Sequence, residues 1–441
     1  MPPPPEPPEL PVTLKPLPPV RTFGAPQPTP PRRSNQEIAR DFLDLTLELE
    51  NGESLPVFTR FREPVTIALA GQTGPVFDLE LDRLIRRIRS EAKIDIRRSS
   101  DPATASIVVE GISRAELERT VPSAACFVLP LRITWAEFRA DMRRRDLDWA
   151  GIASRDAATV FIPADVSPQE IRDCLHEETA QALGPVNDLY RLDDSIFNDD
   201  NMHSVLTGFD MVVLRAAYDA DLHDGMTRDE VAAAIPGILA RINPAGEAYP
   251  TRPYSATPDA WKHDIDDALT PTRSIAARRQ ASLNALGIAQ DEGWQDTRLG
   301  LSLLTSARLS SGQNGVFALE AFLKARDVYG AREATQIHAA NVGIQIAAFA
   351  LAAGDNQTAI ALADRYIPVA RKAENAALLS DFLLVKAAAL DATGQAAAAA
   401  TARREGYGWA RYGLRSDEAV LRRAAEIEAL VPSADYAQEK S

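Results

Sequence analysis

Cysteine is nearly absent from this chain of 441 residues, which contains only Cys126 and Cys174. Two cysteines are too few for a disulfide-rich scaffold or for a four-cysteine zinc site. They are compatible with two reduced thiols or with one disulfide, so the cysteine count does not fix the compartment. A disulfide between them would link the predicted helix that carries Cys174 covalently to the predicted strand region that carries Cys126.

Basic residues are also in deficit, with 48 Lys and Arg against 62 Asp and Glu and a net charge of -14. Such a surface should repel nucleic acid and anionic lipid, and we exclude both as partners. No run of about 18 apolar residues is present, so no transmembrane segment is expected. The N-terminus lacks the charged and apolar regions of a signal peptide. No cofactor is predicted.

Proline is concentrated in residues 1–33, which hold nearly half of the 31 prolines. We expect a disordered or polyproline-II arm there, serving as a spacer; a proline-rich ligand for an adaptor is the alternative. Such spacers often follow a cleaved leader or a lipid anchor in exported bacterial proteins. A periplasmic or envelope location is therefore expected if a leader was removed or lies upstream, and a cytoplasmic one otherwise.

Residues 34–242 alternate between helix and strand patterns. A capping box at Ser34 predicts a helix that runs to about Glu50. Further helices are predicted over 78–92 and from Ser167 to Gly184. The strands are expected at 65–69, 94–96, 106–110, 125–133 and 158–162. The length and this layout predict an α/β domain followed by a second folded part.

Residues 243–258 lose periodicity and predict a linker, and residues 259–432 are helical in pattern throughout. Breaks at 311–313, 353–355 and 393–395 recur at spacings of 42 and 40 residues. This recurrence favours a solenoid of tetratricopeptide-like helical hairpins, although the standard repeat is about 34 residues. Trp261, Trp294 and Trp409 are expected to be core anchors, and residues 433–441 to form a tail.

The stretch from His176 to Asp188 has the skeleton of a zinc-protease helix. In an H-E-x-x-H site two imidazoles four residues apart bind zinc, and the intervening Glu polarises a bound water. Anchoring the pattern on Gly184 places Glu178 at the general base. The three ligand positions then hold other residues: Glu177, Gln181 and Asn187.

The replaced ligands suit a hard cation better than zinc, because they offer oxygen atoms. The binding-cleft candidates are Glu177, Glu178, Gln181, Asn187 and Asp188. Three interpretations stay open: a polar network that caps the helix, a non-catalytic cleft, or a working metal site with Glu178 as base. His176 is expected to be a satisfied, partly exposed side chain, and the acidic loop from Asp193 to Asn201 to be solvated.

The ordered run from Glu177 to Gly184, then Asn187-Asp188, residues 194–197, residues 206–210 and Gly225-Met226 resembles the bacterial family called domain of unknown function 2927. The resemblance covers roughly residues 60–235, and that family in turn resembles matrixin-type metzincins. It implies an α+β zincin-like fold, a small twisted sheet over a site helix, without an established activity. The Met turn of metzincins is missing, since Ser195-Ile196-Phe197 occupies that stretch.

The sequence thus predicts a zincin-like domain plus an all-α helical-hairpin solenoid. The favoured function is a pseudo-protease that binds or scaffolds protein or peptide partners, since a solenoid and a metal-free protease cleft both suit extended chains. The alternative is a metal-dependent hydrolase with ligands Glu177, Gln181 and Asn187. A third reading makes the solenoid the functional part and the other domain mere packing.

Overall fold

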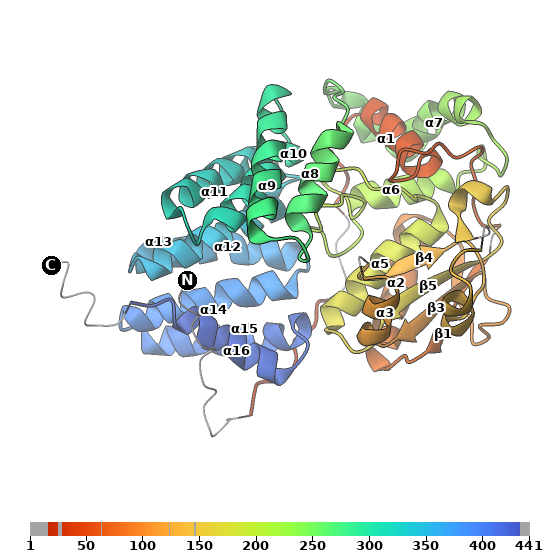
Figure 1. The fold of residues 1–441 in the computed structure, drawn as a ribbon. Helices are drawn as coiled ribbons and strands as arrows, with labels where there is room; N and C mark the ends of the chain where they lie inside the picture. Colours follow the sequence, from red (N-terminus) through yellow and green to blue (C-terminus); the bar gives the residue numbers. More distant parts are fainter. Residues whose placement is uncertain (1–15, 25–28, 63, 123, 145–146, 433–441) are drawn as a thin grey trace. The chain divides into compact units, whose positions relative to one another are not determined.

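The computed structural model describes residues 16–24, 29–62, 64–122, 124–144 and 147–432 (Figure 1). The chain divides into two compact units. The α/β unit comprises residues 25–255, and the helical unit comprises residues 1–24 and 256–441. The predicted linker over 243–258 contains a short 3-10 helix, Pro244–Ala248, and precedes the first helix of the helical unit. Residues 1–15 of the predicted arm and the predicted tail lie outside the described residues.

A five-stranded mixed sheet lies at the centre of the α/β unit, in the order β2-β1-β3-β5-β4. The strands β2, β1, β3 and β5 run parallel, and β4 pairs antiparallel with β5. The strands are β1 (Val65–Gly71), β2 (Ile96–Arg98), β3 (Ile107–Ile112), β4 (Phe127–Leu129) and β5 (Ala158–Pro163). All five predicted strands are confirmed, although β2 starts later and β4 is shorter than expected.

Seven α-helices accompany this sheet in the described residues. They are α1 (Asn35–Leu47), α2 (Pro75–Glu91), α3 (Arg114–Thr120), α4 (Trp135–Ala140), α5 (Pro168–Leu183), α6 (Gly208–Ala217) and α7 (Arg228–Ile242). The predicted capping box is present at α1, where the Ser34 hydroxyl accepts from the Glu37 N–H and the Glu37 carboxylate accepts from the Ser34 N–H. The same reciprocal pair begins α4, α6 and α7.

Apolar side chains cover the two faces of the sheet differently. The main core joins α1, α2, α5, α6 and α7 to buried strand residues such as Ile67, Val109 and Val160. A smaller aromatic cluster contains Trp135, Phe138 and Phe161. The site helix α5 packs against β4, β5 and α2. Its position is therefore fixed by the sheet on one side and by α2 on another.

The helical unit consists of packed helix pairs, which confirms an all-helical C-terminal region. Its helices are α8 (Asp259–Leu269), α9 (Ile275–Asp291), α10 (Thr297–Ser310), α11 (Gly315–Gly330), α12 (Gln336–Ala352), α13 (Asn356–Lys372), α14 (Ala376–Ala392), α15 (Ala396–Gly413) and α16 (Asp417–Glu428). The three predicted breaks separate α10 from α11, α12 from α13, and α14 from α15. Gly354 and Gly394 have φ of 78°, a conformation that favours glycine and ends the helix before each.

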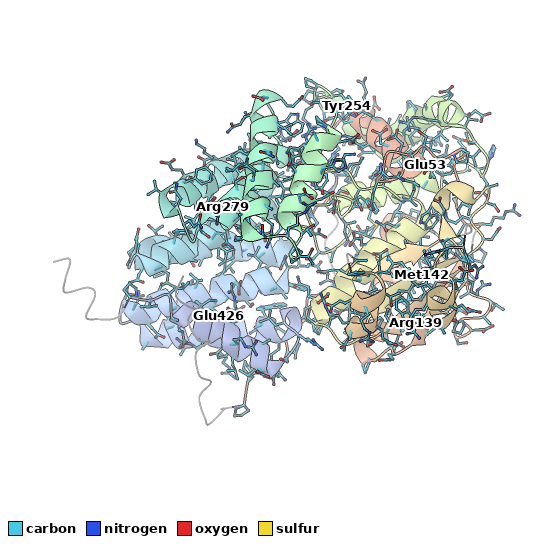
Figure 2. The ribbon with its side chains drawn as sticks, viewed as in Figure 1. Glu53, Arg139, Met142, Tyr254, Arg279 and Glu426 are labelled. Atoms are coloured by element: carbon cyan, nitrogen blue, oxygen red, sulfur yellow. A yellow bond between two sulfur atoms is a disulfide. The ribbon has the colours of Figure 1, made fainter. Side chains whose placement is uncertain are left out.

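Trp261, Trp294 and Trp409 are buried, as expected of core anchors. Large apolar side chains at the described surface include Met142 and Tyr254, which are 45% and 53% exposed (Figure 2). In the described residues, each helix is too short or too polar to cross a membrane.

Candidate functional site

The site helix α5 is fixed at both ends by polar side chains. The Ser167 hydroxyl caps its first turn by accepting from the Glu170 N–H, and Pro168 occupies the first helical position. At the other end, the Arg155 guanidinium donates to the carbonyl oxygens of Gln181 (2.8 Å), Ala182 (2.6 Å) and Gly184 (3.2 Å). These bonds satisfy carbonyls that a helix leaves unpaired at its C-terminus.

Arg155 is buried to 3% exposure, and burial lowers its pKa to about 10. Its guanidinium also lies 4.3 Å from the centre of the Trp149 ring. The role of Arg155 at the end of α5 was not predicted from the sequence. Nothing in the isolated sequence marks it as a helix cap, because it lies 26 residues before the first carbonyl that it binds.

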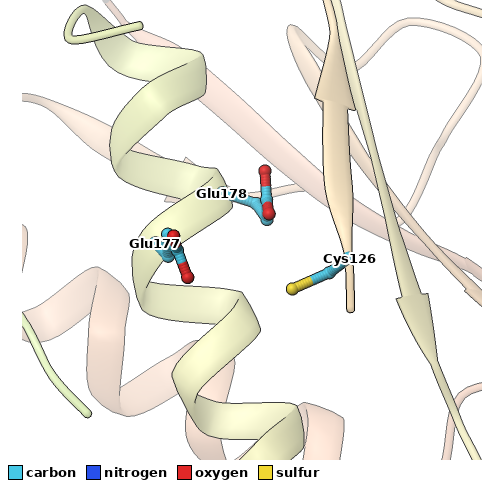
Figure 3. A group of neighbouring side chains, drawn as sticks. All are labelled: Cys126, Glu177 and Glu178. Atoms are coloured by element: carbon cyan, nitrogen blue, oxygen red, sulfur yellow. The ribbon is translucent and has the colours of Figure 1, made fainter. Parts of the chain in front are cut away.

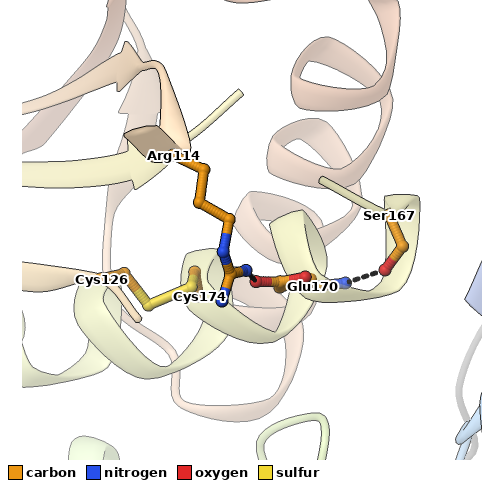
Figure 4. Close-up of a disulfide and its surroundings, with 5 residues drawn as sticks. All are labelled: Arg114, Cys126, Ser167, Glu170 and Cys174. Carbon is orange, nitrogen blue, oxygen red and sulfur yellow. Dashed lines mark hydrogen bonds and ion pairs between the residues drawn. A yellow bond between two sulfur atoms is a disulfide. The ribbon is translucent and has the colours of Figure 1, made fainter. Parts of the chain in front are cut away.

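A disulfide joins Cys126 to Cys174 on the middle of α5, with 6.0 Å between the two Cα atoms. It links the helix to the chain just before β4 (Figure 4). Arg114 forms an ion pair with Glu170 one turn earlier on α5. The site helix is therefore tied to its surroundings covalently as well as by packing and capping.

Glu177 and Glu178 extend from α5 toward Cys126 (Figure 3). One ligand atom from each of Cys126, Glu177 and Glu178 lies within 4.8 Å of the others. Glu178 is 4% exposed, and its Oε2 atom has no hydrogen-bond partner among the described residues. A buried carboxylate without a partner is costly, so a proton or a ligand is needed there.

Burial is the first cause of the raised pKa values in this group of carboxyls. It raises the pKa of Glu177 to about 7, with further contributions from the charges of Asp199 and Glu50. It raises the pKa of Glu178 well above the usual value, assisted by Glu177 and Glu50. Asp188 is raised well above its usual pKa in the same way. We call Glu177, Glu178 and Asp188 the carboxyl cluster; burial favours the protonated forms of Glu178 and Asp188, whereas Glu177 titrates near neutral pH.

Two further predicted site residues lie at the end of α5. Gln181 donates from Nε2 to Asp188 Oδ2 at 3.4 Å, which brings Gln181 to the carboxyl cluster. Asn187 instead donates from Nδ2 to the main-chain oxygen of Asp44 at 2.9 Å. Its amide nitrogen therefore anchors the turn after α5 to α1.

His176 is buried, with 3% exposure, so the expectation of a partly exposed side chain was wrong. Its Nδ1 atom accepts a hydrogen bond from the Leu206 N–H at 3.1 Å, which does satisfy the ring as expected. Burial lowers its pKa well below the usual value. The neutral imidazole therefore links α5 to the segment before α6 through this hydrogen bond.

The expectation of a solvated acidic loop was also wrong. Asp193 is 3% exposed and forms an ion pair with Arg252, and Asp194 forms one with Arg33. Asn198 is buried as well and donates to the Leu192 carbonyl oxygen at 2.6 Å. Arginines that are distant in the sequence made this burial favourable, which a local pattern of acidic residues does not reveal.

The donor set of the carboxyl cluster does not fit zinc, which proteins bind mainly through imidazole and thiolate. The sulfur of Cys126 is in a disulfide, and His176 is engaged with the main chain. A cavity of about 360 Å³ is lined by Arg60, Phe61, Arg62, His223 and Asp224, none of which belongs to the cluster. Among the described residues, the cluster therefore offers carboxyl oxygens to a metal ion, without a free imidazole or thiolate beside them.

A second candidate site lies in the helical unit, where residues 16–24 contact α15. We call these residues the arm segment. The Arg21 N–H donates to the Gly408 carbonyl oxygen, and Arg411 Nη1 donates to the Pro18 carbonyl oxygen, each at 2.9 Å. Phe23 stacks on Trp409 with 4.4 Å between ring centres. From the sequence we expected a spacer here, with a proline-rich ligand as the alternative. Phe23, an aromatic residue within the proline-rich arm, was the available signal for a contact.

Comparison with known families agrees with part of this picture. The family model described as protein of unknown function (DUF2927) matches residues 35–237. The chain carries a DUF2927 domain. The match begins at α1, earlier than the expected start near residue 60, and ends within α7. No curated protein and no solved structure matches the chain.

Proposed function

We propose that this DUF2927 protein is a non-catalytic binding or scaffolding protein for polypeptides. In this proposal the α/β unit is a zincin-like domain that has lost its metal chemistry, and the helical unit is a tetratricopeptide-like solenoid. The observation that carries the proposal is the arm segment on α15. There the protein holds an extended polypeptide by main-chain hydrogen bonds and by one aromatic side chain.

The chemistry of the carboxyl cluster supports the non-catalytic part of the proposal. A zinc hydrolase needs ligands that hold the metal and a base that is ionised at the working pH. Here the sulfur of Cys126 is in a disulfide and the amide of Asn187 donates to the Asp44 carbonyl oxygen, so both are engaged elsewhere. The Cys126–Cys174 disulfide also favours an oxidising compartment such as the cell envelope.

The competing function is a metal-dependent hydrolase with Glu178 as general base. The observation in its favour is the buried, unpartnered Oε2 atom of Glu178, beside Glu177. Oxygen ligands would favour a hard cation over zinc.

Metal content separates the two functions. We expect the purified full-length protein to contain far less than one equivalent of any tightly held transition metal or Ca²⁺ by plasma mass spectrometry, and Glu177→Ala to leave this value unchanged. Glu53→Ala is the matched control, because Glu53 is exposed and lies in the same unit. One equivalent of tightly held metal that is lost in Glu177→Ala but kept in Glu53→Ala would reject the non-catalytic function.

A further inference from the structure

The arm segment is held at two points that lie three residues apart. The Pro18 carbonyl oxygen accepts from Arg411, whose own Nε is held by Asp417 Oδ1 at 2.8 Å. The Arg21 N–H donates to Gly408. Both bonds use the main chain of the arm, so they fix its direction and register while tolerating many side chains.

Phe23 supplies the side-chain anchor. It is 6% exposed, stacks on Trp409, and meets Tyr412 edge-on with 6.0 Å between ring centres. By contrast, Val20 is 44% exposed and Arg21 and Thr22 are also exposed. The deepest contact therefore belongs to one aromatic residue, which is how peptide-binding sites commonly concentrate their affinity.

The absence of a side chain at Gly408 allows the arm to approach α15. A Cβ atom at this position would lie 3.0 Å from Arg21 Cγ and 3.2 Å from the Pro19 carbonyl oxygen. Burial raises the pKa of Glu405, one turn earlier on α15, whereas Arg371 and the positive charge of Arg21 lower this pKa. Proline at positions 18 and 19 limits φ in the free chain, which reduces the entropy lost on binding.

We propose that this face of α15 is a recognition site for proline-rich segments of the pattern Pro-Pro-x-Arg-x-Phe, and that the arm occupies it in cis until a partner segment displaces it. This inference rests on the proposed polypeptide-binding function and names its ligand class. The partner is an extended, basic, proline-rich segment of another protein with an aromatic residue two positions after the arginine.

Competition by the arm has a measurable consequence. A ligand tethered in the same chain acts at an effective concentration of about 1 mM. For a peptide that binds the open site with a Kd of about 10–100 µM, the tethered arm weakens apparent binding about ten- to hundredfold. Removal of the arm's anchor should restore that affinity.

The test uses a fluorescein-labelled peptide with the sequence of residues 16–24 and measures fluorescence anisotropy on full-length variants. Phe23→Ala should bind the peptide at least tenfold more tightly than the wild-type protein. Adding Gly408→Ala should weaken binding of the peptide again, because the segment must move away from α15 by a few tenths of an ångström. Adding Gly287→Ala should not, because a Cβ at Gly287 meets no atom within 4 Å.

Each contrary result has a distinct meaning. Equal, tight binding by wild type and Phe23→Ala would reject occupation in cis but leave polypeptide binding intact. Tight binding by the Phe23→Ala/Gly408→Ala variant would move the site away from α15. If Phe23→Ala does not bind the peptide at all, the recognition pattern is wrong, while peptides of other sequence would still test the broader function.

Discussion

In the carboxyl cluster, burial and then the neighbouring carboxyls raise the pKa values of side chains on and beside α5. Glu178 is nearly inaccessible, and Glu177 lies close enough for the two carboxyls to repel each other when both are ionised. The folded protein avoids that cost by keeping protons on the cluster. At the residue scale, Glu178 on α5 is therefore a buried carboxyl that favours its neutral form.

The cluster makes stability dependent on pH. The pKa of Glu177 is 4.5 in its ordinary state and about 7 in the folded protein. Between these pH values the folded state keeps a proton on Glu177 that the unfolded state has released, so the contribution of Glu177 to stability falls as pH rises from 4.5 to 7 and changes little above 7. Glu177→Gln should remove this loss. We expect its unfolding free energy at pH 8 to exceed that of the wild type by about 1–2 kcal/mol.

Urea unfolding at pH 4.5 and at pH 8 measures this effect. The two proteins should differ much less at pH 4.5, where Glu177 is protonated in the folded wild type and about half protonated in the unfolded chain. Glu53→Gln, which changes an exposed carboxylate of the same unit, should show no such gain. A Glu177→Gln variant that is less stable than wild type at pH 8 would mean that the ionised carboxylate is stabilising.

At the scale of elements, the same glycine–tyrosine contact occurs in two helix pairs of the helical unit. A Cβ atom at Gly300 of α10 would lie 2.3 Å from the Tyr329 ring on α11. A Cβ atom at Gly343 of α12 would lie 2.3 Å from the Tyr366 ring on α13. In each pair a glycine of the first helix makes room for a tyrosine of the second. These contacts bring the helices of a hairpin close together.

Gly343→Ala should therefore destabilise the helical unit. The added methyl group would displace the buried Tyr366 ring, at a cost of about 1–3 kcal/mol that outweighs the helix propensity of alanine. Gly287→Ala in α9 is the matched control, because its methyl group meets open space and should stabilise by about 0.5–1 kcal/mol. Thermal unfolding followed by circular dichroism measures both; equal shifts in the two variants would contradict the packing account.

Local signals predicted most of these elements. Ser34 and Ser167 marked the starts of α1 and α5, because a hydroxyl that caps a helix is a contact within one turn. The glycine-containing breaks after α10, α12 and α14 were equally local. Within the site, Gln181 and Asp188 are close in sequence, and the turn after α5 brings them within hydrogen-bond distance.

Contacts between distant segments were not predictable in this way. Asp193 is buried because Arg252 reaches it from 59 residues away. Arg411 donates to Pro18 across 393 residues, a contact that the proline-rich composition of the arm does not reveal. Composition predicts the conformation of an isolated segment. It does not predict which distant residues the tertiary structure brings into contact with that segment.

At the scale of the whole molecule, the chain contains a DUF2927 domain and a stack of helix pairs. That stack binds the arm segment of the same chain. The net charge of -14 suits the basic segment proposed as partner, because opposite charges accelerate encounter. Arg21 in the arm segment is positively charged, so the negatively charged protein attracts it.

Native mass spectrometry of the full-length Phe23→Ala protein, mixed with the peptide of residues 16–24, tests the central claim most directly. It reports bound metal and bound peptide in one spectrum. The account predicts the mass of the metal-free chain, about 47.9 kDa, and that mass plus one intact peptide. A chain that carries one transition-metal ion and releases cleaved peptide would contradict it.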